Sequence, residues 1–492
     1  MSSPRDWLRG RALATPDRIA LIDAATGAET TYAGLDAAAA RWARRLAEWG
    51  VRSHDRVAVL CLNRAEVFEL LFACARLNAT LLPLSWRLAP AELEVIAHDA
   101  RPALLLHDAT YAAMAGDLGD ALGIPTTSLA APVTLNARHD AIQDGQAAAM
   151  MLYTSGTTGK PKGAMLPWRQ ITTNAVNTTL SFDLQEDDRC LAFLPLFHTG
   201  GLNCLAIPLL WRGGAVVLTE RFDAEEALRT MAEQRVTKVI AVPTMFDMLF
   251  EAGLELRRPE HLRLLLSGGA PCPDALLDRA HGSGFVMSQG YGLTEAGPNL
   301  FTGSPQEGPH RLGTVGRASV HAEIELIHDG AFVGPGDVGE IVIRGPLLMD
   351  GYFERPDANR ETLDADGWLH TGDLATRSED GVYRVVGRAK EMFISGGENV
   401  YPAEVENALR EHPAIHGVAV VGVDDPRWGQ VGLAAVVADP PHDTDALRAW
   451  ARERLAPFKV PRHVLWLDAL PLNASGKVVK AEVARLFAEA RG

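Results

Sequence analysis

Ten residues in the first third of the chain carry the side chains that would suit a polyphosphate. Residues 154–163, TSGTTGKPKG, hold three glycines, four hydroxyls and two lysines. Glycine has no Cβ to keep backbone N–H groups away from a ligand. Phosphate oxygens are acceptors and mostly anionic, so exposed N–H groups, hydroxyls and ammonium groups match them. We predict a polyphosphate loop in preference to a flexible linker, because Pro161 separates the lysines and a strand-like apolar run, 148–152, precedes the segment.

This loop does not match the Walker P-loop, G-x-x-x-x-G-K-[ST]. Lys160 follows Gly159, but Thr154 stands where the first glycine belongs, and Pro161 replaces the magnesium-binding Ser or Thr. Proline disfavours helical backbone at the residue before it, so the loop should not lead straight into a helix. The sequence therefore predicts a phosphate loop of another kind.

Three other segments combine reactive side chains with glycine. His198, in LPLFHTGG, has glycines nearby that would leave open space beside its imidazole, although a lone His is more often structural. Residues 267–271, SGGAP, follow an apolar strand, where glycines let a flat ligand approach the backbone. In residues 289–297, QGYGLTEAG, the tyrosine could stack on adenine, the threonine could contact phosphate, and Glu295 could bind Mg²⁺, which takes only one or two protein carboxylates in nucleotide sites. A plain turn would explain either of the last two segments alone.

Two more positions would pass for ordinary surface residues. Asp373 closes DGWLHTGD, where an aspartate is commonly a turn or cap residue. Lys477 lies in PLNASGK, and a solvated lysine is the usual interpretation of such a loop. Only their combination with the segments above gives them another meaning.

Taken together, these segments resemble the adenylate-forming superfamily, which contains acyl-CoA synthetases, aryl-CoA ligases, luciferases and nonribosomal adenylation domains. TSGTTGKPKG resembles its phosphate-binding signature, and YGLTE at 291–295 matches its YGxTE motif. GRAKE at 387–391 and SGGEN at 395–399 follow in the family's order, and the similarity covers essentially the whole chain. One departure, Ala318 where relatives commonly have the proline of VGRP, concerns only a connecting segment.

The resemblance implies that ATP, Mg²⁺ and coenzyme A bind, and it assigns residues to each role. The implied ATP-binding residues are Thr154, Ser155, Gly156, Thr157, Thr158, Gly159, Lys160, Lys162, Gly269, Ala270, Pro271, Gln289, Gly290, Tyr291, Gly292, Asp373 and Arg388. The implied catalytic residues are Lys477, Glu295, Thr294 and His198, with Glu295 as the metal ligand. The implied acyl pocket is formed by His198, Gly200, Gly201, Asn203, Cys204, Gly268, Pro298 and Asn299. The implied CoA-binding residues are Ser395, Gly396, Gly397, Glu398 and Trp428, and the implied hinge is Lys390.

The implied reaction has two steps. A carboxylate attacks the α-phosphorus of ATP and expels pyrophosphate, and the CoA thiol then attacks the acyl-adenylate and releases AMP. The phosphate loop would cover the β- and γ-phosphates. Between the steps, a C-terminal domain, 390–492, would rotate relative to an N-terminal domain, 1–389, so that Lys477 withdraws and residues 395–399 approach.

The acid is predicted only by class. Aromatic-acid CoA ligases tend to have a ring-contacting side chain two residues after the family's histidine, and here that position is Gly200, which indicates a roomier pocket. Residues 296–298, AGP, are more typical of aryl and medium-chain ligases than of long-chain ones. We therefore expect a medium-chain or aromatic carboxylic acid as the small-molecule partner.

Three alternatives stay open at this point. A stand-alone adenylation domain would load a carrier protein, and a luciferase-like oxygenase would share the first step. A nucleotide-binding sensor that has lost catalysis is the third. The joint presence of the implied catalytic lysine, the implied metal ligand and the two residues that the resemblance assigns to the ribose argues against the sensor; these are Lys477, Glu295, Asp373 and Arg388.

The elements between the motifs alternate between strands and helices, as in parallel α/β sheets. We predict helices at 35–49 and 65–77 and strands at 56–62, 103–106, 148–152, 215–218, 238–242 and 262–266. Short strands after about residue 313, at 322–327 and 339–343, predict a small β-unit. The last part predicts a mobile α+β domain with helices at 402–410 and 445–455, apolar runs at 418–423 and 433–437, an extended run at 463–467 and a terminal helix. The predicted fold is α/β, with two sheet layers and the β-unit in the large N-terminal domain and a smaller C-terminal domain.

Composition excludes several classes of protein. With 47 basic and 62 acidic residues, the chain of 492 residues has a net charge of −15, which argues against nucleic acid as a partner. Its five cysteines are odd in number and form no C-x-x-C pair, which indicates a reducing, cytoplasmic location. We found no signal-peptide core and no apolar run of about 18 residues, so a membrane-spanning helix is not expected. A homodimer is one assembly left open.

Overall fold

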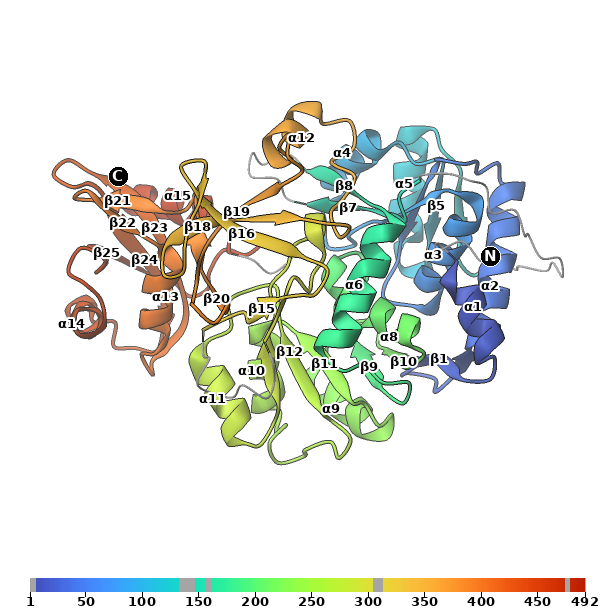
Figure 1. The fold of residues 1–492 in the computed structure, drawn as a ribbon, viewed down its shortest axis with the longest axis horizontal. Coiled ribbons are helices and arrows are strands. Elements are labelled where there is room, and N and C mark those ends of the chain that lie inside the picture. Colours follow the sequence, from blue (N-terminus) through green and yellow to red (C-terminus); the bar gives the residue numbers. More distant parts are fainter. Residues whose placement is uncertain (1–5, 132–146, 155–160, 304–312, 474–477, 492) are drawn as a thin grey trace. The chain divides into compact units, whose positions relative to one another are not determined.

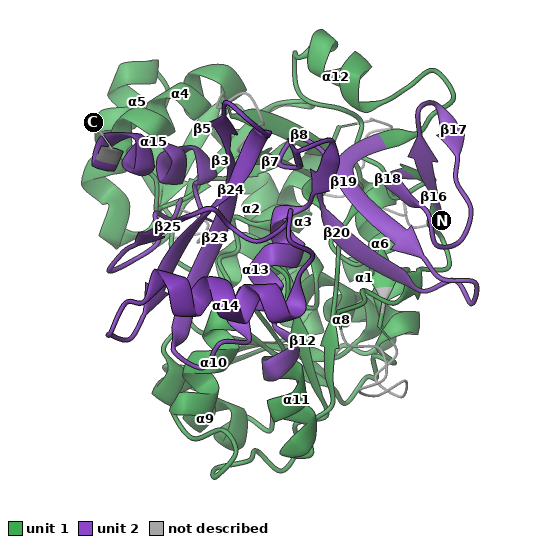
Figure 2. Ribbon diagram, turned by 90° about the vertical axis from the view of Figure 1, so that its left-hand side faces the viewer, with its two compact units in different colours: residues 1–272, 276–323, 343–369 green, residues 273–275, 324–342, 370–492 purple. Residues whose placement is uncertain are grey.

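The structure, a computed structural model, describes residues 6–131, 147–154, 161–303, 313–473 and 478–491. The chain divides into two compact units (Figure 2). Unit 1 comprises residues 1–272, 276–323 and 343–369, and unit 2 comprises residues 273–275, 324–342 and 370–492. Figure 1 shows the elements along the chain.

The first sheet of unit 1 has six strands in the order β6-β5-β3-β4-β7-β8. Its strands are β3 (Arg56–Leu60), β4 (Thr80–Pro83), β5 (Leu104–His107), β6 (Thr126–Ser128), β7 (Met150–Thr154) and β8 (Lys162–Leu166). Neighbours are parallel except for β7 and β8. The crossovers are made by α3 (Ala65–Leu77), α4 (Pro90–Ala100), η1 (Ala109–Tyr111) and α5 (Ala112–Leu122). These are the βαβ units that the alternating pattern predicts.

The second sheet of unit 1 has seven strands in the order β13-β12-β11-β9-β10-β1-β2. They are β1 (Ile19–Asp23), β2 (Glu29–Thr31), β9 (Arg189–Ala192), β10 (Ala215–Leu218), β11 (Lys238–Ala241), β12 (Leu264–Ser267) and β13 (Met287–Gln289). All pairs but β1–β2 are parallel. The carboxyl ends of parallel strands meet at one edge, so the segments after β9, β12 and β13 lie at that edge. They are the LPLFHTGG, SGGAP and QGYGLTEAG segments.

Helices and short elements complete unit 1. They are α1 (Trp7–Ala14), α2 (Tyr32–Glu48), α6 (Trp168–Ser181), α7 (Thr199–Asn203), α8 (Ala206–Arg212), α9 (Ala224–Glu233), α10 (Pro243–Glu251), α11 (Asp274–Gly282), η2 (Thr294–Ala296), β14 (Phe301–Thr302), β15 (Arg317–Ala318) and α12 (Pro356–Thr362). Trp42 of α2, Phe68 and Phe72 of α3 and Trp168 of α6 belong to one apolar core. Burial of such aromatic side chains contributes roughly 25 cal/mol per Å² of apolar surface.

Unit 2 contains two sheets. The five-stranded sheet, β17-β16-β18-β19-β20, consists of β16 (Glu323–His328), β17 (Ala331–Phe332), β18 (Val338–Arg344), β19 (Leu369–Arg377) and β20 (Tyr383–Arg388). The other has the order β22-β21-β24-β23, with β25 beside β24. Its elements and helices are β21 (Phe393–Ser395), β22 (Glu398–Val400), α13 (Pro402–Arg410), β23 (Ile415–Asp425), β24 (Gly429–Ala438), α14 (Thr444–Arg454), β25 (His463–Trp466) and α15 (Lys480–Arg491). Apolar residues of α13, β23, β24 and α14 share a core of their own, as a separate α+β domain requires.

The predicted fold class is confirmed, and two element ends differ from the prediction because of particular hydrogen bonds. Helix α2 begins three residues before the predicted start, because the Thr31 hydroxyl oxygen accepts a hydrogen bond from Gly34 N at 3.1 Å and caps the helix. Strand β3 ends before Leu62, whose N–H donates to the Asp108 carboxylate at 2.9 Å instead of a strand partner. Within the described ranges, we found no helix with the length and apolarity needed to cross a bilayer.

The domain boundary predicted between residues 389 and 390 is different in kind from the division into two compact units. The division into units follows packing, and it groups most of the five-stranded sheet with the C-terminal part of the chain. A hinge is defined by motion instead of packing. The domain boundary at Lys390 therefore stays a prediction.

Candidate functional site

The phosphate-loop motif connects two antiparallel strands. In the β7–β8 pair, Thr154 lies opposite Lys162 and Tyr153 lies opposite Gly163. A Cβ on Gly163 would lie 2.3 Å from Met151 Cε and 3.2 Å from the Tyr153 ring, so these neighbouring side chains would have to move to admit one. The chain enters β8 at Lys162, within the motif, which confirms that the loop does not lead into a helix. The remaining predicted loop residues, Ser155, Gly156, Thr157, Thr158, Gly159 and Lys160, lie outside the described residues.

The predicted metal ligand, Glu295, has a tyrosine partner. The Tyr352 hydroxyl donates to Glu295 Oε1 at 2.8 Å, and the Tyr352 ring centre lies 5.2 Å from Lys162 Nζ. Burial, with the nearby Glu295 charge, raises the pKa of Tyr352 well above its usual range, so the hydroxyl is protonated and donates. Tyr352 therefore links β8, the second strand of the β7–β8 hairpin, to Glu295 in the QGYGLTEAG segment.

The residues around Glu295 fit a magnesium ion that is held mainly by a nucleotide. In the described part of the chain we found no group of three or more His, Cys, Asp or Glu side chains arranged as a metal site. Mg²⁺ bound with phosphates keeps several waters and needs only one or two protein carboxylates. The half-buried Glu295 could supply one, because Tyr352 occupies only its Oε1.

Helix α6 holds the QGYGLTEAG segment and helix α7, which starts just after His198, together through buried amides. Gln170 Nε2 donates to the Thr294 carbonyl at 3.0 Å, and Asn174 Nδ2 donates to the Asn203 carbonyl at 2.6 Å. Residues 170 and 174 are one helical turn apart and so lie on one face. On the next turn, Thr178 accepts a hydrogen bond from Asn299 Nδ2 at 2.7 Å. The predicted nucleotide and acid segments are thus held against one polar face of α6.

His198 and its glycines form the start of α7. His198 occupies the position before the first helical residue, and its ring centre lies 4.5 Å from that of Phe197. A Cβ on Gly200 would meet nothing closer than Leu194 Cδ1 at 3.9 Å, whereas a Cβ on Gly201 would lie 2.3 Å from the Pro195 carbonyl oxygen. Open space was expected beside both glycines. The structure shows it at Gly200, while the chain passes too close to Gly201 to leave any.

The SGGAP and QGYGLTEAG segments, which contain predicted ATP-binding residues, lie after β12 and β13. Gly269 has a positive φ of +81° and nothing closer to its Cβ position than Val242 at 3.5 Å, so a flat ligand could approach the backbone there. Gly268, Ala270 and Pro271 flank it, and Gln289 Oε1 accepts a hydrogen bond from Cys272 N at 3.0 Å. The half-buried Tyr291 ring lies 5.5 Å from that of Phe301.

The glycines of the QGYGLTEAG segment have different surroundings. A Cβ on Gly292 would lie 2.3 Å from the Pro298 carbonyl, so Gly292 allows two chain segments to pass each other. Gly290 has only ordinary van der Waals neighbours, with Leu266 at 3.5 Å. The side chains of Asn203, Cys204, Pro298 and Asn299 are buried. Burial raises the pKa of the Cys204 thiol to about 12, so it is not a nucleophile.

In unit 2, the two predicted ribose-binding residues meet across a hairpin. Asp373 on β19 lies opposite Arg388 on β20, and Arg388 Nε donates to Asp373 Oδ1 at 3.0 Å. The Asp373 side chain is only 12% exposed, whereas that of Arg388 is 53% exposed. An aspartate held by a neighbouring arginine is fixed as a charged acceptor, which suits hydroxyl groups.

The predicted CoA-step segment is a tight hairpin in unit 2. Gly396 and Gly397, with φ of +63° and +92°, connect β21 to β22, a conformation that other residues rarely adopt. Gly396 N donates to the Trp428 carbonyl at 2.9 Å, and a Cβ on Gly396 would lie 2.6 Å from the Trp428 ring. Ser395 is buried and Glu398 is exposed on either side of the turn. Lys390 is exposed in the turn after β20.

Within each unit, therefore, residues far apart in the sequence are brought together. The predicted catalytic Lys477 lies outside the described residues, as does the centre of the phosphate loop. Tyr352 and Gln170 were not among the residues predicted from the sequence. Their interactions with Glu295 and Thr294 depend on tertiary contacts, and no local motif marks either residue.

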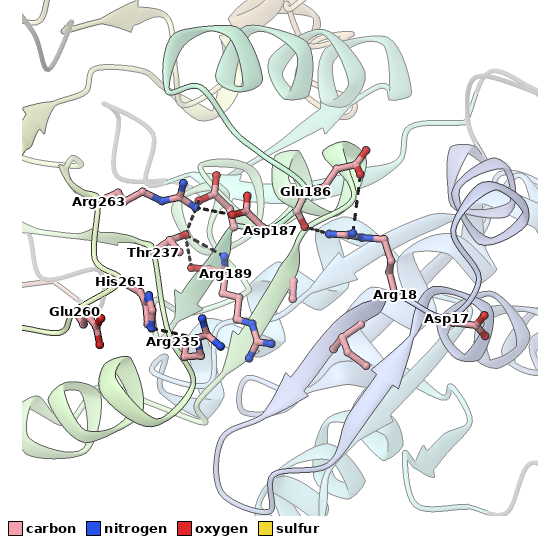
Figure 3. Close-up of a pocket in the computed structure, with 13 residues that line it drawn as sticks. Asp17, Arg18, Glu186, Asp187, Arg189, Arg235, Thr237, Glu260, His261 and Arg263 are labelled. Carbon is pink, nitrogen blue, oxygen red and sulfur yellow. Dashed lines mark hydrogen bonds and ion pairs between the residues drawn. The ribbon is translucent and has the colours of Figure 1, made fainter.

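A charged hollow of about 670 Å³ lies at the opposite edge of the second sheet, at the amino ends of its strands (Figure 3). It is lined by Asp17, Arg18, Ile19, Glu186, Asp187, Asp188, Arg189, Ala215, Arg235, Thr237, Glu260, His261 and Arg263. Arg263 donates to Asp188 at 2.7 Å, and Arg235 Nε contacts His261 Nε2 at 3.1 Å. Acidic and basic side chains are mixed in this hollow and several pair with one another. We assign it no part in the chemistry.

Comparisons with known protein families identify the class. Residues 8–353 match the model of the AMP-binding enzyme family, and residues 404–477 match that of the AMP-binding enzyme C-terminal domain. The chain belongs to this family of AMP-binding enzymes. The resemblance seen in the motifs is thus confirmed, together with the predicted class of AMP-forming acyl-CoA synthetase.

The similar proteins include several ligases with aromatic substrates in their names. A feruloyl-CoA synthase from an Amycolatopsis species is 42% identical, over 98% of both chains. A 2-succinylbenzoate–CoA ligase from Bacillus licheniformis is 38% identical, over 96% of this chain and 98% of the relative. The o-succinylbenzoate-CoA synthetase of Bacillus subtilis, in complex with the acyl-adenylate intermediate, superposes with a TM-score of 0.90 at 36% identity, over 97% of this chain and 98% of that one. The same enzyme was also solved with ATP and a magnesium ion.

Proposed function

We propose that this protein joins an aromatic carboxylic acid to coenzyme A through an acyl-adenylate, with release of AMP and pyrophosphate. The observation that carries the proposal is the full-length similarity to the feruloyl-CoA and 2-succinylbenzoate–CoA enzymes. The open space at Gly200 would give room to a bulky acyl group, whether it carries a ring or a chain of medium length. A medium-chain acid is the second candidate for the same space.

For the first step, the difficulty is to bring a carboxylate up to an anionic triphosphate. When bound at Glu295, Mg²⁺ would neutralise phosphate charge, and Lys162 would add a positive charge at the start of β8. We assign Lys477 to the same charge and Thr294 to a phosphate contact. Fixed donors and cations of this kind are worth roughly 3–4 kcal/mol each in well-studied sites. We assign Asp373 and Arg388 to the ribose, where the Asp373 carboxylate would accept hydrogen bonds from the ribose hydroxyl groups.

For the second step, we propose a rotation of residues 390–492 about Lys390. The turn at Gly396 and Gly397 presents backbone without side chains, which would let the narrow pantetheine arm of CoA pass close to the chain. Trp428 supports this turn with its carbonyl and its ring. AMP is a far better leaving group than hydroxide, so the thiol can displace it without further activation of the acid.

An acid panel tests the proposal. We would measure AMP release with ATP, Mg²⁺ and CoA in the presence of acetate, octanoate, palmitate, benzoate, a cinnamate or succinylbenzoate. The proposal expects at least one aromatic acid to give the highest kcat/KM, with equal amounts of AMP and CoA thioester. Octanoate as the best substrate would favour the medium-chain alternative. AMP formation without CoA consumption would favour an adenylation domain that loads a carrier protein.

We further propose a cytoplasmic location and a homodimeric assembly. All five cysteines are buried and unpaired, which suits a reducing compartment. Light scattering on the purified protein would distinguish a dimer from a monomer.

A further inference from the structure

The segment 349–353 connects the β7–β8 hairpin to the QGYGLTEAG segment. It runs along the free edge of β8, with Met165 N donating to the Gly351 carbonyl at 2.9 Å and Phe353 N donating to the Gly163 carbonyl at 2.8 Å. At its other end, Met349 N donates to the Glu295 carbonyl at 2.7 Å. One short segment thus fixes the backbone of β8 and the backbone of Glu295 relative to each other.

The side chain of Tyr352 repeats this connection. Its hydroxyl donates to Glu295 Oε1 at 2.8 Å, and its ring faces Lys162 Nζ at 5.2 Å. A lysine over a tyrosine ring is attracted by the negative face of the ring. One aromatic residue therefore contacts both a carboxylate and an ammonium group that the proposed function assigns to the magnesium–phosphate complex.

Tyr352 is itself held firmly. Its N–H donates to Asn359 Oδ1 at 2.6 Å, and Asn359 Nδ2 donates to the Tyr352 carbonyl at 3.0 Å. The preceding Gly351 has φ of +119°, and a Cβ there would lie 3.0 Å from Asn359 Oδ1. The glycine thus leaves room for Asn359 to hydrogen-bond to both the N–H and the carbonyl of Tyr352.

A carboxylate held at one oxygen presents the other in a fixed direction. Among the described residues, Glu295 Oε2 has no hydrogen-bond donor, whereas Oε1 is occupied by the phenol. Without the phenol, the carboxylate could rotate, and a bound cation would have to order it. Groups that orient a metal ligand typically change metal affinity 10- to 100-fold when they are removed.

We propose that Tyr352 is a positioning residue. Its hydroxyl orients Glu295 toward the magnesium ion of the ATP complex, and its ring holds Lys162 beside that ion. This inference rests on the proposed function. It adds a residue that touches neither the acid nor the reacting phosphorus and acts through Glu295.

The test measures magnesium binding by heat denaturation. At saturating ATP and without acid, the midpoint temperature would be followed as free Mg²⁺ is raised, since a ligand that binds only the folded protein raises this temperature. Tyr352→Phe removes only the hydroxyl and should need about tenfold more Mg²⁺ for half of the shift. The midpoint with ATP and EDTA should equal that of the unaltered protein.

Tyr153→Phe is the matched control. The Tyr153 hydroxyl also donates to a carboxylate, Asp99 Oδ2, at 2.7 Å, and Tyr153 is likewise half-buried in the same unit. This variant should keep the magnesium requirement of the unaltered protein. In a Glu295→Gln background, Tyr352→Phe should cause no further change, because its effect acts through Glu295.

A magnesium requirement within twofold of the unaltered protein in Tyr352→Phe would overturn the inference. An equal change in Tyr153→Phe, or a full additional change in the Glu295→Gln background, would overturn it as well. If Tyr352→Phe does not fold, Asn359→Ala should raise the magnesium requirement at least threefold, and no rise would overturn the inference. Failure of the proposed function is distinguishable, because in that case no acid of the panel gives AMP with the unaltered protein.

Discussion

Two adjacent glycines after His198 should respond in opposite ways to the same substitution. Gly200 and Gly201 are both in α7, and neither has a positive φ. A Cβ on Gly200 has 3.9 Å to its nearest neighbour, whereas on Gly201 it would lie 2.3 Å from the Pro195 carbonyl oxygen and 2.8 Å from that of Leu194. Backbone oxygens cannot move away as the end of a side chain could.

The expected magnitudes follow from these distances. Gly201→Ala overpacks the segment, which typically costs about 1–3 kcal/mol, and should lower the melting temperature by roughly 2–8 °C. Gly200→Ala fits its space and replaces a helical glycine, which typically gains about 0.5–1 kcal/mol. It should leave the melting temperature unchanged or raise it by roughly 1–3 °C.

A larger side chain at position 200 tests the pocket itself. Gly200→Leu would extend into the open space and should lower kcat/KM for the best aromatic acid about tenfold or more, with a much smaller effect on acetate. The assay is AMP release across the acid panel, with melting curves for all three variants. Equal stability of Gly200→Ala and Gly201→Ala would refute the packing argument. An unchanged preference for aromatic acids in Gly200→Leu would refute the assignment of this space to the acid.

Three further predictions concern the two half-reactions and stability. Lys477→Ala should lower acid-dependent pyrophosphate exchange by roughly two to three powers of ten and leave thioester formation from supplied acyl-adenylate largely intact, and an equal loss of both would contradict its role. Lys390→Pro should spare pyrophosphate exchange and abolish thioester formation, so CoA turnover by this variant would disprove the hinge. Burial, reinforced by the charge of Glu251, raises the pKa of Asp247 to about 6. The folded protein therefore holds this proton more tightly than the unfolded chain, and stability is lost as pH rises from about 4 through 6. Asp247→Asn should raise the free energy of unfolding by about 1–2 kcal/mol at pH 8 and by little at pH 4, and the same gain at both pH values would contradict this.

Most of the fold could be predicted from local sequence patterns. Helices α3 and α13 begin and end where the sequence predicts, because apolar periodicity and their end signals coincide there. Helix α2 starts earlier because Thr31 caps it, and a threonine four residues before the predicted apolar stripe at Leu35 is a signal that could have been used. The end of β3 depends on the distant Asp108 and leaves no local trace.

The residues of the candidate site that belong to sequence motifs could be predicted. The residues that reach it only through tertiary contacts could not. Asp373 and Arg388 were both predicted to contact the ribose, and in the β19–β20 hairpin Arg388 Nε lies 3.0 Å from Asp373 Oδ1. Tyr352 lies 57 residues from Glu295, and nothing near it in the sequence indicates that it reaches a carboxylate. The different surroundings of Gly200 and Gly201 depend on how residues 194–195 pass the helix, which a run of two glycines cannot reveal.

The central claim is that this chain activates an aromatic carboxylate with ATP and transfers the acyl group to CoA. The most direct measurement is an analysis of all products after incubation with ATP, Mg²⁺, CoA and the best acid of the panel. We expect AMP, pyrophosphate and aryl-CoA in equal amounts, with aryl-adenylate accumulating when CoA is left out. Release of ADP, or AMP formation at the same rate without any acid, would contradict it.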